Sequence, residues 1–529
     1  MSETFPWLTV LGALPLAGAC VVAALPRGRD LLAKRVALLV SLATLVLTGL
    51  VAAQFETGRA GYQLTESYEW IPQFGVTYSL GVDGVALVLL GLSAVLVPVV
   101  VLASWHDAET GAGAAPKRSV KGFFALVLLL EAFMIGVFAA TDVFLFYVFF
   151  EAMLVPMYFL IGSYGGPQRS YAAVKFLLYS LFGGLLMLAA VIGLGVVASD
   201  QVADPDTTFA LSGLVGLDID PNIEKALFLG FFVAFAIKAP MWPVHTWLPD
   251  AAAQSTPGAA VLLVGVLDKV GTFGMLRYCL PLFPDASDYF TPLIVVLAVV
   301  SILYGALLAV GQTDMRRLVA YTSISHFGFI VLGVFALTSQ GLAGATLYMV
   351  NHGFSTGMLF LIAGFLIARH RSALITDYSG VQSVAPWLAG AFLFAGLSSL
   401  SLPGMSTFVS EFLVLVGTFS RYEVAAVLAT LGIVLAALYI LFWYQRTMTG
   451  RVKEGLEKTP DLGFREAWVV APLMVLILAL GVYPKPVLDV ITPTVDRTLE
   501  QVGTTDPGPS VSAETTGGAG ETNAGGTDQ

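Results

Sequence analysis

Apolar stretches as long as a membrane-spanning helix recur along most of the chain, from Phe5 to Pro484. A bilayer core requires roughly 20 apolar residues of helix per crossing. The pattern predicts fourteen spans, which makes the chain an all-α polytopic membrane protein. The predicted spans lie near residues 5–25, 36–53, 82–104, 122–140, 143–163, 174–198, 226–247, 256–281, 291–311, 316–338, 341–368, 386–420, 423–445 and 467–484.

Two of these spans are interrupted by helix-breaking residues. Pro240, Pro243 and Pro249 interrupt the end of the seventh span, and Pro403 and Gly404 interrupt the twelfth. Backbone that leaves a helix inside a membrane is tolerated only where protein or a cavity surrounds it. Paired interruptions of this kind are typical of transport pathways.

Basic residues alternate between the two sets of loops that fourteen spans create. The loops after odd-numbered spans hold seventeen cations and the opposite side holds six, so the positive-inside rule places both termini outside. The inner cations are Arg27, Arg29, Lys34, Arg35, Lys117, Arg118, Lys121, Arg169, Arg316, Arg317, Arg369, Arg371, Arg446, Arg451, Lys453, Lys458 and Arg465. The outer cations are Arg59, Lys225, Arg277, Arg421, Lys485 and Arg497, among acids that include Glu56, Glu66, Glu69, Asp200, Asp204, Asp206, Asp218 and Asp220.

Composition supports the membrane assignment and excludes several functions. Hydrophobic residues make up 57% of the 529 residues and charged residues 12%, against about 25% charged in soluble domains. The net charge is −10, and no basic stripe suggests nucleic-acid binding. The two cysteines, Cys20 and Cys279, form no metal-binding motif, so we expect no iron-sulfur, haem or zinc cofactor in this chain.

Nine ionisable residues fall inside predicted spans, where a charge costs roughly 2.5–3.5 kcal/mol at the bilayer centre. They are Glu131, Glu151, Lys175, Lys238, Asp268, Lys269, His326, His352 and Glu411. Glu151, Lys238, Lys269 and Glu411 lie deep in long spans or beside helix breaks, which favours a functional role. For Glu131, Lys175 and Asp268, structural pairing is an equally good interpretation, and Asp268 could simply neutralise Lys269.

Proton movement is the chemistry that these residue types favour. A Glu151–Lys238 pair would be a tunable proton site, because separating the carboxylate from the ammonium favours release of the lysine proton. His326 and His352 have hydroxyl and amide neighbours that can support ordered water, although lone histidines in apolar helices are more often core residues. Histidine changes charge most readily near neutral pH, which suits a proton relay.

Nearly constant spacing suggests an internal repeat. Glu151 and His326 are 175 residues apart, Lys175 and His352 are 177 apart, and Lys238 and Glu411 are 173 apart. Spans 4–8 then correspond to spans 9–13, and an odd number of spans per unit makes the two copies inverted. The predicted divisions are 1–121 (three spans), 122–281 (first repeat), 291–445 (second repeat), 446–490 (loop and last span) and 491–529 (a polar, disordered external tail).

Four motifs resemble the antiporter-like subunits of respiratory complex I. They are FAIKAPMWPVHTWLPD at 235–250, EAMLVPMYFLIG at 151–162, YTSISH at 321–326 and NHGFST at 351–356. Two features are most similar to the chain M branch of this family. One is the second motif; the other is Glu411, at a position where chains L and N and the cation/proton antiporter relative usually have lysine. The chain also lacks the length for the lateral helix that ends chain L.

The resemblance implies a proton-translocating subunit of a bacterial NADH-quinone oxidoreductase in the plasma membrane. It makes Glu151 and Lys238 a modulating pair, Lys269 a central relay, His326 and His352 the connection onward, and Glu411 the terminal proton site. Lys175, His245, Glu131 and Asp268 are accessory candidates, and His245 could equally be a packing residue. FMN, iron-sulfur clusters, NADH and quinone are expected in partner subunits, of which the two neighbouring antiporter-like chains are the nearest.

Two other functional classes remain open from the residues alone. A subunit of a sodium/proton antiporter, or of a membrane-bound hydrogenase, would share the fold. A structural membrane scaffold would use the buried charges only to pair helices.

Overall fold

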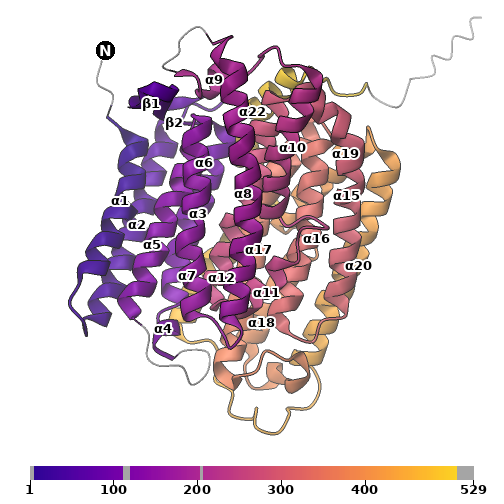
Figure 1. The fold of residues 1–529 in the computed structure, drawn as a ribbon. Helices are drawn as coiled ribbons and strands as arrows, with labels where there is room; N and C mark the ends of the chain where they lie inside the picture. Colours follow the sequence, from indigo (N-terminus) through magenta and orange to yellow (C-terminus); the bar gives the residue numbers. More distant parts are fainter. Residues whose placement is uncertain (1–4, 111–118, 203–206, 509–529) are drawn as a thin grey trace, which may run out of the picture.

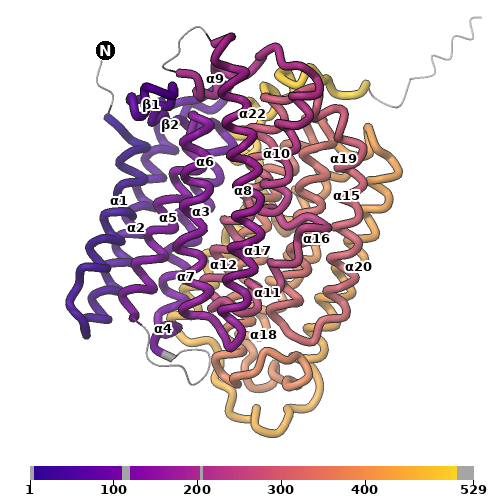
Figure 2. Tube along the Cα trace, viewed as in Figure 1, coloured from indigo at the N-terminus to yellow at the C-terminus, as the bar shows by residue number. Residues whose placement is uncertain are grey.

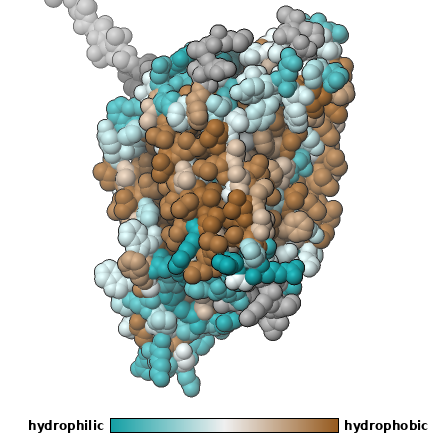
Figure 3. Space-filling view, turned by 90° about the vertical axis from the view of Figure 1, so that its left-hand side faces the viewer, coloured by the Kyte–Doolittle hydropathy of each residue, from teal (hydrophilic) through white to brown (hydrophobic). Residues whose placement is uncertain are grey.

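The computed structural model describes residues 5–110, 119–202 and 207–508 as a bundle of long helices (Figure 1). On the face shown in Figure 3, a broad apolar band covers the middle of the bundle, with polar surface at both ends. In the described residues, twelve helices are long and apolar enough to cross a membrane. These features confirm the predicted class of polytopic helical membrane protein.

The helix and strand limits match the predicted spans closely. The first half contains α1 (Trp7–Ala24), α2 (Asp30–Gln54), β1 (Gln63–Ile71), η1 (Pro72–Phe74), β2 (Val76–Val82), α3 (Gly84–Ala103), α4 (Asp107–Thr110), α5 (Val120–Ala139), α6 (Val143–Ala152), α7 (Leu154–Tyr164), α8 (Arg169–Ser199), α9 (Leu211–Leu214), α10 (Pro221–Lys238), α11 (Trp247–Gln254) and α12 (Pro257–Leu262). The second contains η3 (Leu263–Leu267), α13 (Lys269–Gly274), η4 (Met275–Cys279), α14 (Leu280–Leu282), α15 (Pro284–Val310), α16 (Met315–Phe335), α17 (Ser339–His370), η5 (Ile375–Asp377), η6 (Val381–Ser383), α18 (Pro386–Ser399), α19 (Ser406–Phe419), α20 (Glu423–Met448), α21 (Phe464–Val482) and α22 (Lys485–Val502).

The two predicted spans outside these twelve are the interrupted ones. The seventh is split into α10 and α11, and the twelfth into α18 and α19. The tube in Figure 2 shows α10 and α19 in the upper half of the bundle and α11 and α18 in the lower half, so the two breaks lie near mid-height and the chain passes them in opposite directions. This agrees with inverted repeats, while the count of fourteen crossings and the repeat boundaries stay predictions.

The most deeply enclosed helices carry four of the nine ionisable residues, namely Asp268, Lys269, His326 and His352. The span from Pro257 to Leu282, which comprises α12–α14, is entirely buried in protein, and α16 and α17 are 94% buried over their apolar segments. Outer helices such as α2, α20 and α21 are about one-third buried, so most of their apolar surface faces outward. The protein therefore surrounds its polar residues with a shell of apolar helices.

Both described ends of the chain lie at the same end of the bundle, with the β1–β2 hairpin. Glu66 in β1 accepts a hydrogen bond from Leu8 N at 2.6 Å, and Thr494 in α22 accepts one from Gly84 N, directly after β2, at 3.1 Å. Predicted inner loops meet at the other end: Lys121 donates to Leu25 O at 2.6 Å. The loop grouping thus follows the prediction, although Lys117, Arg118, Asp204 and Asp206 lie outside the described residues.

The predicted polar tail at 491–529 is wrong for its first twelve residues, which belong to α22. This helix buries Ile491, Val495 and Leu499 at four-residue spacing against the ends of the membrane helices, and exposes charged residues on its other face. Its polar face made the segment look like a tail. The rest of the predicted tail, from residue 509, lies outside the described residues.

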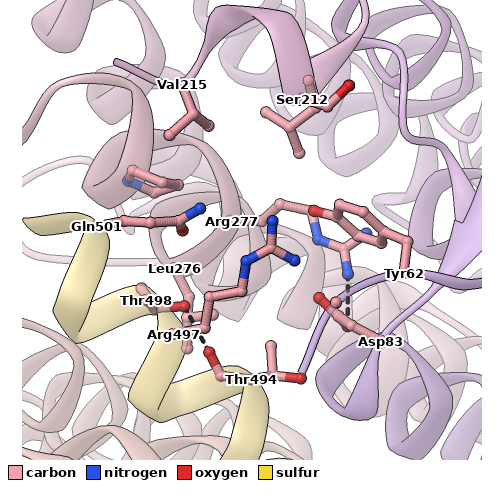
Figure 4. A pocket seen from close by; sticks show the side chains of 13 residues that line it. Tyr62, Asp83, Ser212, Val215, Leu276, Arg277, Thr494, Arg497, Thr498 and Gln501 are labelled. Atoms are coloured by element: carbon pink, nitrogen blue, oxygen red, sulfur yellow. Dashed lines mark hydrogen bonds and ion pairs between the residues drawn. The ribbon is translucent and has the colours of Figure 1, made fainter. Parts of the chain in front are cut away.

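A buried ion pair fixes the start of α3 to the end of the eighth span beside a cavity of about 170 Å³ (Figure 4). Arg277 in η4 contacts Asp83 at 2.6 Å, and both side chains are less than a tenth exposed. Asp83 also caps α3 by accepting a hydrogen bond from Ala86 N at 2.8 Å. The pair joins the start of α3 to the buried span from Pro257 to Leu282.

Replacing Asp83 with alanine is expected to destabilise the protein strongly, because Arg277 would stay buried without a partner. Breaking a buried ion pair from one side costs about 3–5 kcal/mol. Asp83→Asn keeps a capping side chain and separates this loss from the loss of the cap. Thermal unfolding of the purified complex measures the effect, with the exposed Asp489→Ala as control; equal midpoints for Asp83→Ala and the control would contradict the assignment.

Candidate functional site

Lys238 ends α10 at the first helix break. Pro240 and Pro243 cannot continue the helix, and Trp247 Nε1 donates to the freed carbonyl of Ile237 at 2.9 Å. The Lys238 side chain is 1% exposed, its Nζ has no hydrogen-bond partner, and Nζ lies 4.6 Å from the centre of the Phe150 ring. The break therefore holds an ammonium group inside the protein, over an aromatic ring and without a hydrogen-bond partner.

Glu151 lies near the end of α6, where the fifth span is interrupted between α6 and α7. Its Oε1 is buried without a hydrogen-bond partner and lies against Gly184 of α8. Lys238 Nζ lies over the ring of Phe150, the residue before Glu151, and no salt bridge joins Glu151 to Lys238 in the part of the chain that the structure describes. The structure thus brings the predicted pair together as neighbours that are not in direct contact.

Gly184→Ala is expected to displace the Glu151 carboxylate, because a Cβ at this position would lie 1.7 Å from Oε1. Misplacement of a reacting group by about 1 Å can cost up to a hundredfold, so we expect a loss of roughly fivefold or more in proton translocation. Gly193→Ala is the matched control, since its Cβ would meet only the flexible end of Leu227. The rate of NADH-driven proton translocation per assembled complex checks this, and equal rates in the two variants would contradict it.

Lys269 begins α13, directly after the π-helical turn η3. In this turn Asp268 N bonds to Leu263 O, five residues earlier, and the Lys269 ammonium donates to Val264 O. π-Helical turns are frequent at functional sites. Lys269 Nζ also lies 2.7 Å from His352 Nδ1 in α17, and both side chains are fully buried.

The two histidines are neighbours in the structure. The His352 and His326 ring centres are 5.4 Å apart, and His352 Nε2 lies 3.1 Å from the hydroxyl of Ser323. His326 Nε2 has no hydrogen-bond partner, and its Nδ1 lies 2.5 Å from the hydroxyl of Tyr348. No direct hydrogen bond therefore joins the two histidine rings in the part of the chain that the structure describes.

Glu411 ends the row at the second helix break. Its Oε2 accepts hydrogen bonds from Tyr348 at 3.4 Å and from Ser401, which lies in the break between α18 and α19. Five buried residues therefore form a polar row whose neighbours are joined by hydrogen bonds except between the two histidine rings: Lys269, His352, His326, Tyr348 and Glu411.

None of the accessory candidates is a member of this row, although Asp268 is the chain neighbour of Lys269. Lys175 pairs with Asp250 of α11 at 2.7 Å, and Arg317 shares that carboxylate at 2.5 Å. His245 lies in the break after α10, with its ring centre 5.1 Å from that of Tyr304. Glu131 is fully buried in α5, and neither of its carboxylate oxygens has a hydrogen-bond partner. Asp268 is likewise fully buried and unpartnered.

Sequence reasoning missed two hydroxyl residues of the row. Tyr348 lies against His326 and Glu411, and Ser401 donates to Glu411. Ser323, a hydroxyl neighbour of His326 in the sequence, instead contacts His352. Tyr348 lies four residues before His352, so both project from one face of α17. The four-residue spacing could have identified Tyr348 from the sequence. Ser401 could not be identified in this way, because the irregular backbone of the break brings it to Glu411.

Comparison with known proteins identifies the family. Residues 140–436 match the family model described as "NADH:quinone oxidoreductase/Mrp antiporter, TM". The chain belongs to this family. It is 55% identical to NADH-quinone oxidoreductase subunit M of Mycobacterium tuberculosis H37Rv over 531 residues, covering 96% of each chain.

Solved structures agree with this assignment. A chain of respiratory complex I from Thermus thermophilus with bound NADH is 32% identical, with a TM-score of 0.84 over 94% of this chain and 100% of that one. A chain of the Mrp complex from Dietzia sp. shares the fold at 23% identity, with a TM-score of 0.80 over 94% of this chain and 98% of that one. The subunit M relative is thus much more similar in sequence than the antiporter chain.

Proposed function

We propose that this family member translocates protons across the bacterial plasma membrane as a subunit of NADH-quinone oxidoreductase. The polar row from Lys269 to Glu411 carries the proposal. It offers consecutive donors and acceptors through the enclosed centre of the bundle, where water outside the protein has no access. The 55% identity to a subunit M over almost the whole chain supports the complex in which the row operates.

Translocation begins at Glu151 and Lys238 in this proposal. Movement of the Glu151 carboxylate relative to Lys238 changes how strongly the lysine holds its proton. The released proton passes to Lys269, then through the two histidines and Tyr348 to Glu411. Protons enter from the end with the basic loops, which is the cytoplasmic side by the positive-inside rule, and both termini are external.

Redox chemistry belongs to partner subunits in this proposal. NADH, FMN, iron-sulfur clusters and quinone bind there, and the neighbouring membrane subunits transmit the conformational or electrostatic change to Glu151. The accessory residues Lys175, His245 and Glu131 hydrate or position the entry region.

Glu411→Gln is expected to reduce NADH-driven proton translocation to roughly a tenth or less, because the amide cannot carry a proton and general acid–base groups contribute 100-fold or more. The measurement is the initial rate of proton translocation in membrane vesicles, divided by the amount of assembled complex. Glu423→Gln, at the exposed start of α20, is the matched control and keeps the parental rate.

The same vesicles separate the rival functions. A scaffold predicts that Glu411→Gln changes the amount of assembled complex but leaves translocation per complex unchanged. A stand-alone antiporter predicts that added sodium collapses a pH gradient without NADH. Either result would contradict the proposed function.

A further inference from the structure

Asp268 is the buried acid that the row leaves unexplained. It is fully buried in the eighth span, and neither carboxylate oxygen has a hydrogen-bond partner. Leaving a buried carboxylate unpaired is expensive, so such a group calls for a reason. A direct ion pair with Lys269 does not supply it, because the Lys269 ammonium bonds to Val264 O and His352 instead.

The two adjacent residues lie on different faces of the eighth span. Thr272, three residues after Lys269, contacts Met349 of α17 at 3.1 Å, so this face is directed toward α17 and His352. Gly271, three residues after Asp268, packs directly on the end of α10: a Cβ there would lie 2.5 Å from Phe235 O and from Ala239 N. Residues three apart share a helix face, which directs Asp268 toward the end of α10.

Lys238 is the residue that α10 presents at this end. Ala239, which touches Gly271, is its immediate neighbour in the chain. Two cations act electrostatically on Asp268, namely Lys269 and Lys238, and the two acids that act on Lys238 are Glu151 and Asp268. Asp268 therefore lies between the Glu151–Lys238 pair and the polar row.

Building on the proposed function, on which the inference rests, we propose that Asp268 is a proton carrier that links Lys238 to Lys269. The Lys238 ammonium transfers one proton to the Asp268 carboxylate, leaving a neutral amine and a carboxylic acid. After Lys269 has passed its own proton to His352, the Asp268 carboxylic acid protonates the Lys269 amine and becomes a carboxylate again. Adjacent residues on two faces of one helix thus carry the proton from one repeat to the other.

Asp268→Asn in the whole complex tests this role, because the amide keeps the shape and cannot carry the proton. We expect the rate of proton translocation per assembled complex to fall about tenfold or more. Asp268→Glu retains a carboxyl group and is expected to keep at least about half of the rate. Asp489→Asn, on the exposed face of α22, is the control with the parental rate.

Lys238→Met in the same preparation separates this inference from the proposed function. Parental translocation in Asp268→Asn beside a severe loss in Lys238→Met would overturn the role of Asp268 alone. Parental rates in both variants would overturn the proposed pathway as well.

Infrared spectroscopy keeps the inference testable if Asp268→Asn does not assemble. NADH addition to the whole complex is expected to change a carboxylic-acid band that shifts in Asp268→Glu, because aspartic and glutamic acid groups absorb at different frequencies. An unshifted difference spectrum would mean that Asp268 does not change protonation, and would overturn the role.

Discussion

Replacing Lys238 with methionine is expected to reduce NADH-driven proton translocation per assembled complex at least tenfold. The side chain keeps a similar length beside the Phe150 ring, but the one cation in the last turn of α10 is lost. Methionine has no proton to release, so movement of the Glu151 carboxylate can no longer cause a proton transfer at position 238. General acid–base groups contribute about 100-fold or more, so the expected loss is large.

Lys225→Met is the matched control for Lys238→Met. Lys225 lies in the first turns of the same helix, where its ammonium stands 3.8 Å from the centre of the Tyr289 ring. The same substitution there removes one positive charge from α10 without touching the break. Equal proton translocation in the two variants would contradict the role of Lys238.

Replacing Tyr348 with phenylalanine is expected to slow proton translocation roughly tenfold, because it removes the hydroxyl that bridges His326 and Glu411. The ring stays in place, so α17 keeps its packing. Tyr439→Phe removes a hydroxyl from another fully buried tyrosine near Glu411, outside the row, and is expected to keep most of the rate. Time courses of vesicle acidification measure both variants; a loss confined to Tyr439→Phe would contradict the row.

Most of the fold could be predicted from the sequence because the bilayer imposes a simple length requirement. Each apolar stretch had to become a helix long enough to cross, and the observed limits follow the predicted ones within a few residues in most spans. Pro240, Pro243, Pro403 and Gly404 marked the two breaks correctly, since proline removes a backbone donor and glycine permits irregular backbone. Pro249 was wrongly assigned to the first break: it lies in the first turn of α11, where a missing backbone donor is tolerated. The β1–β2 hairpin and α22 were missed because neither crosses the bundle.

The candidate site was predictable as a set of residue types but not as a sequence of contacts. The cost of a charge in an apolar helix identified Lys238, Lys269 and Glu411. Tyr348 was missed because tyrosine is common in membrane helices and draws no notice without its neighbours. The orientation of Asp268 depends on the π-helical turn η3, which changes the helix phase in a way that the sequence pattern does not display.

A single continuous pathway makes a distinct prediction for combined variants. Gly184→Ala disturbs the beginning of the pathway at Glu151, and Tyr348→Phe interrupts its end. For steps in series the times add, so the double variant should translocate protons within about twofold of the slower single variant. If the two substitutions caused independent structural defects, their fold-losses in the translocation rate would instead multiply.

The measurement that tests the central claim most directly is therefore the rate of NADH-driven proton translocation per assembled complex in the Gly184→Ala, Tyr348→Phe double variant beside both single variants. The account predicts a rate within about twofold of the slower single variant. A rate close to the product of the two single effects would contradict a common proton pathway through Glu151 and Glu411.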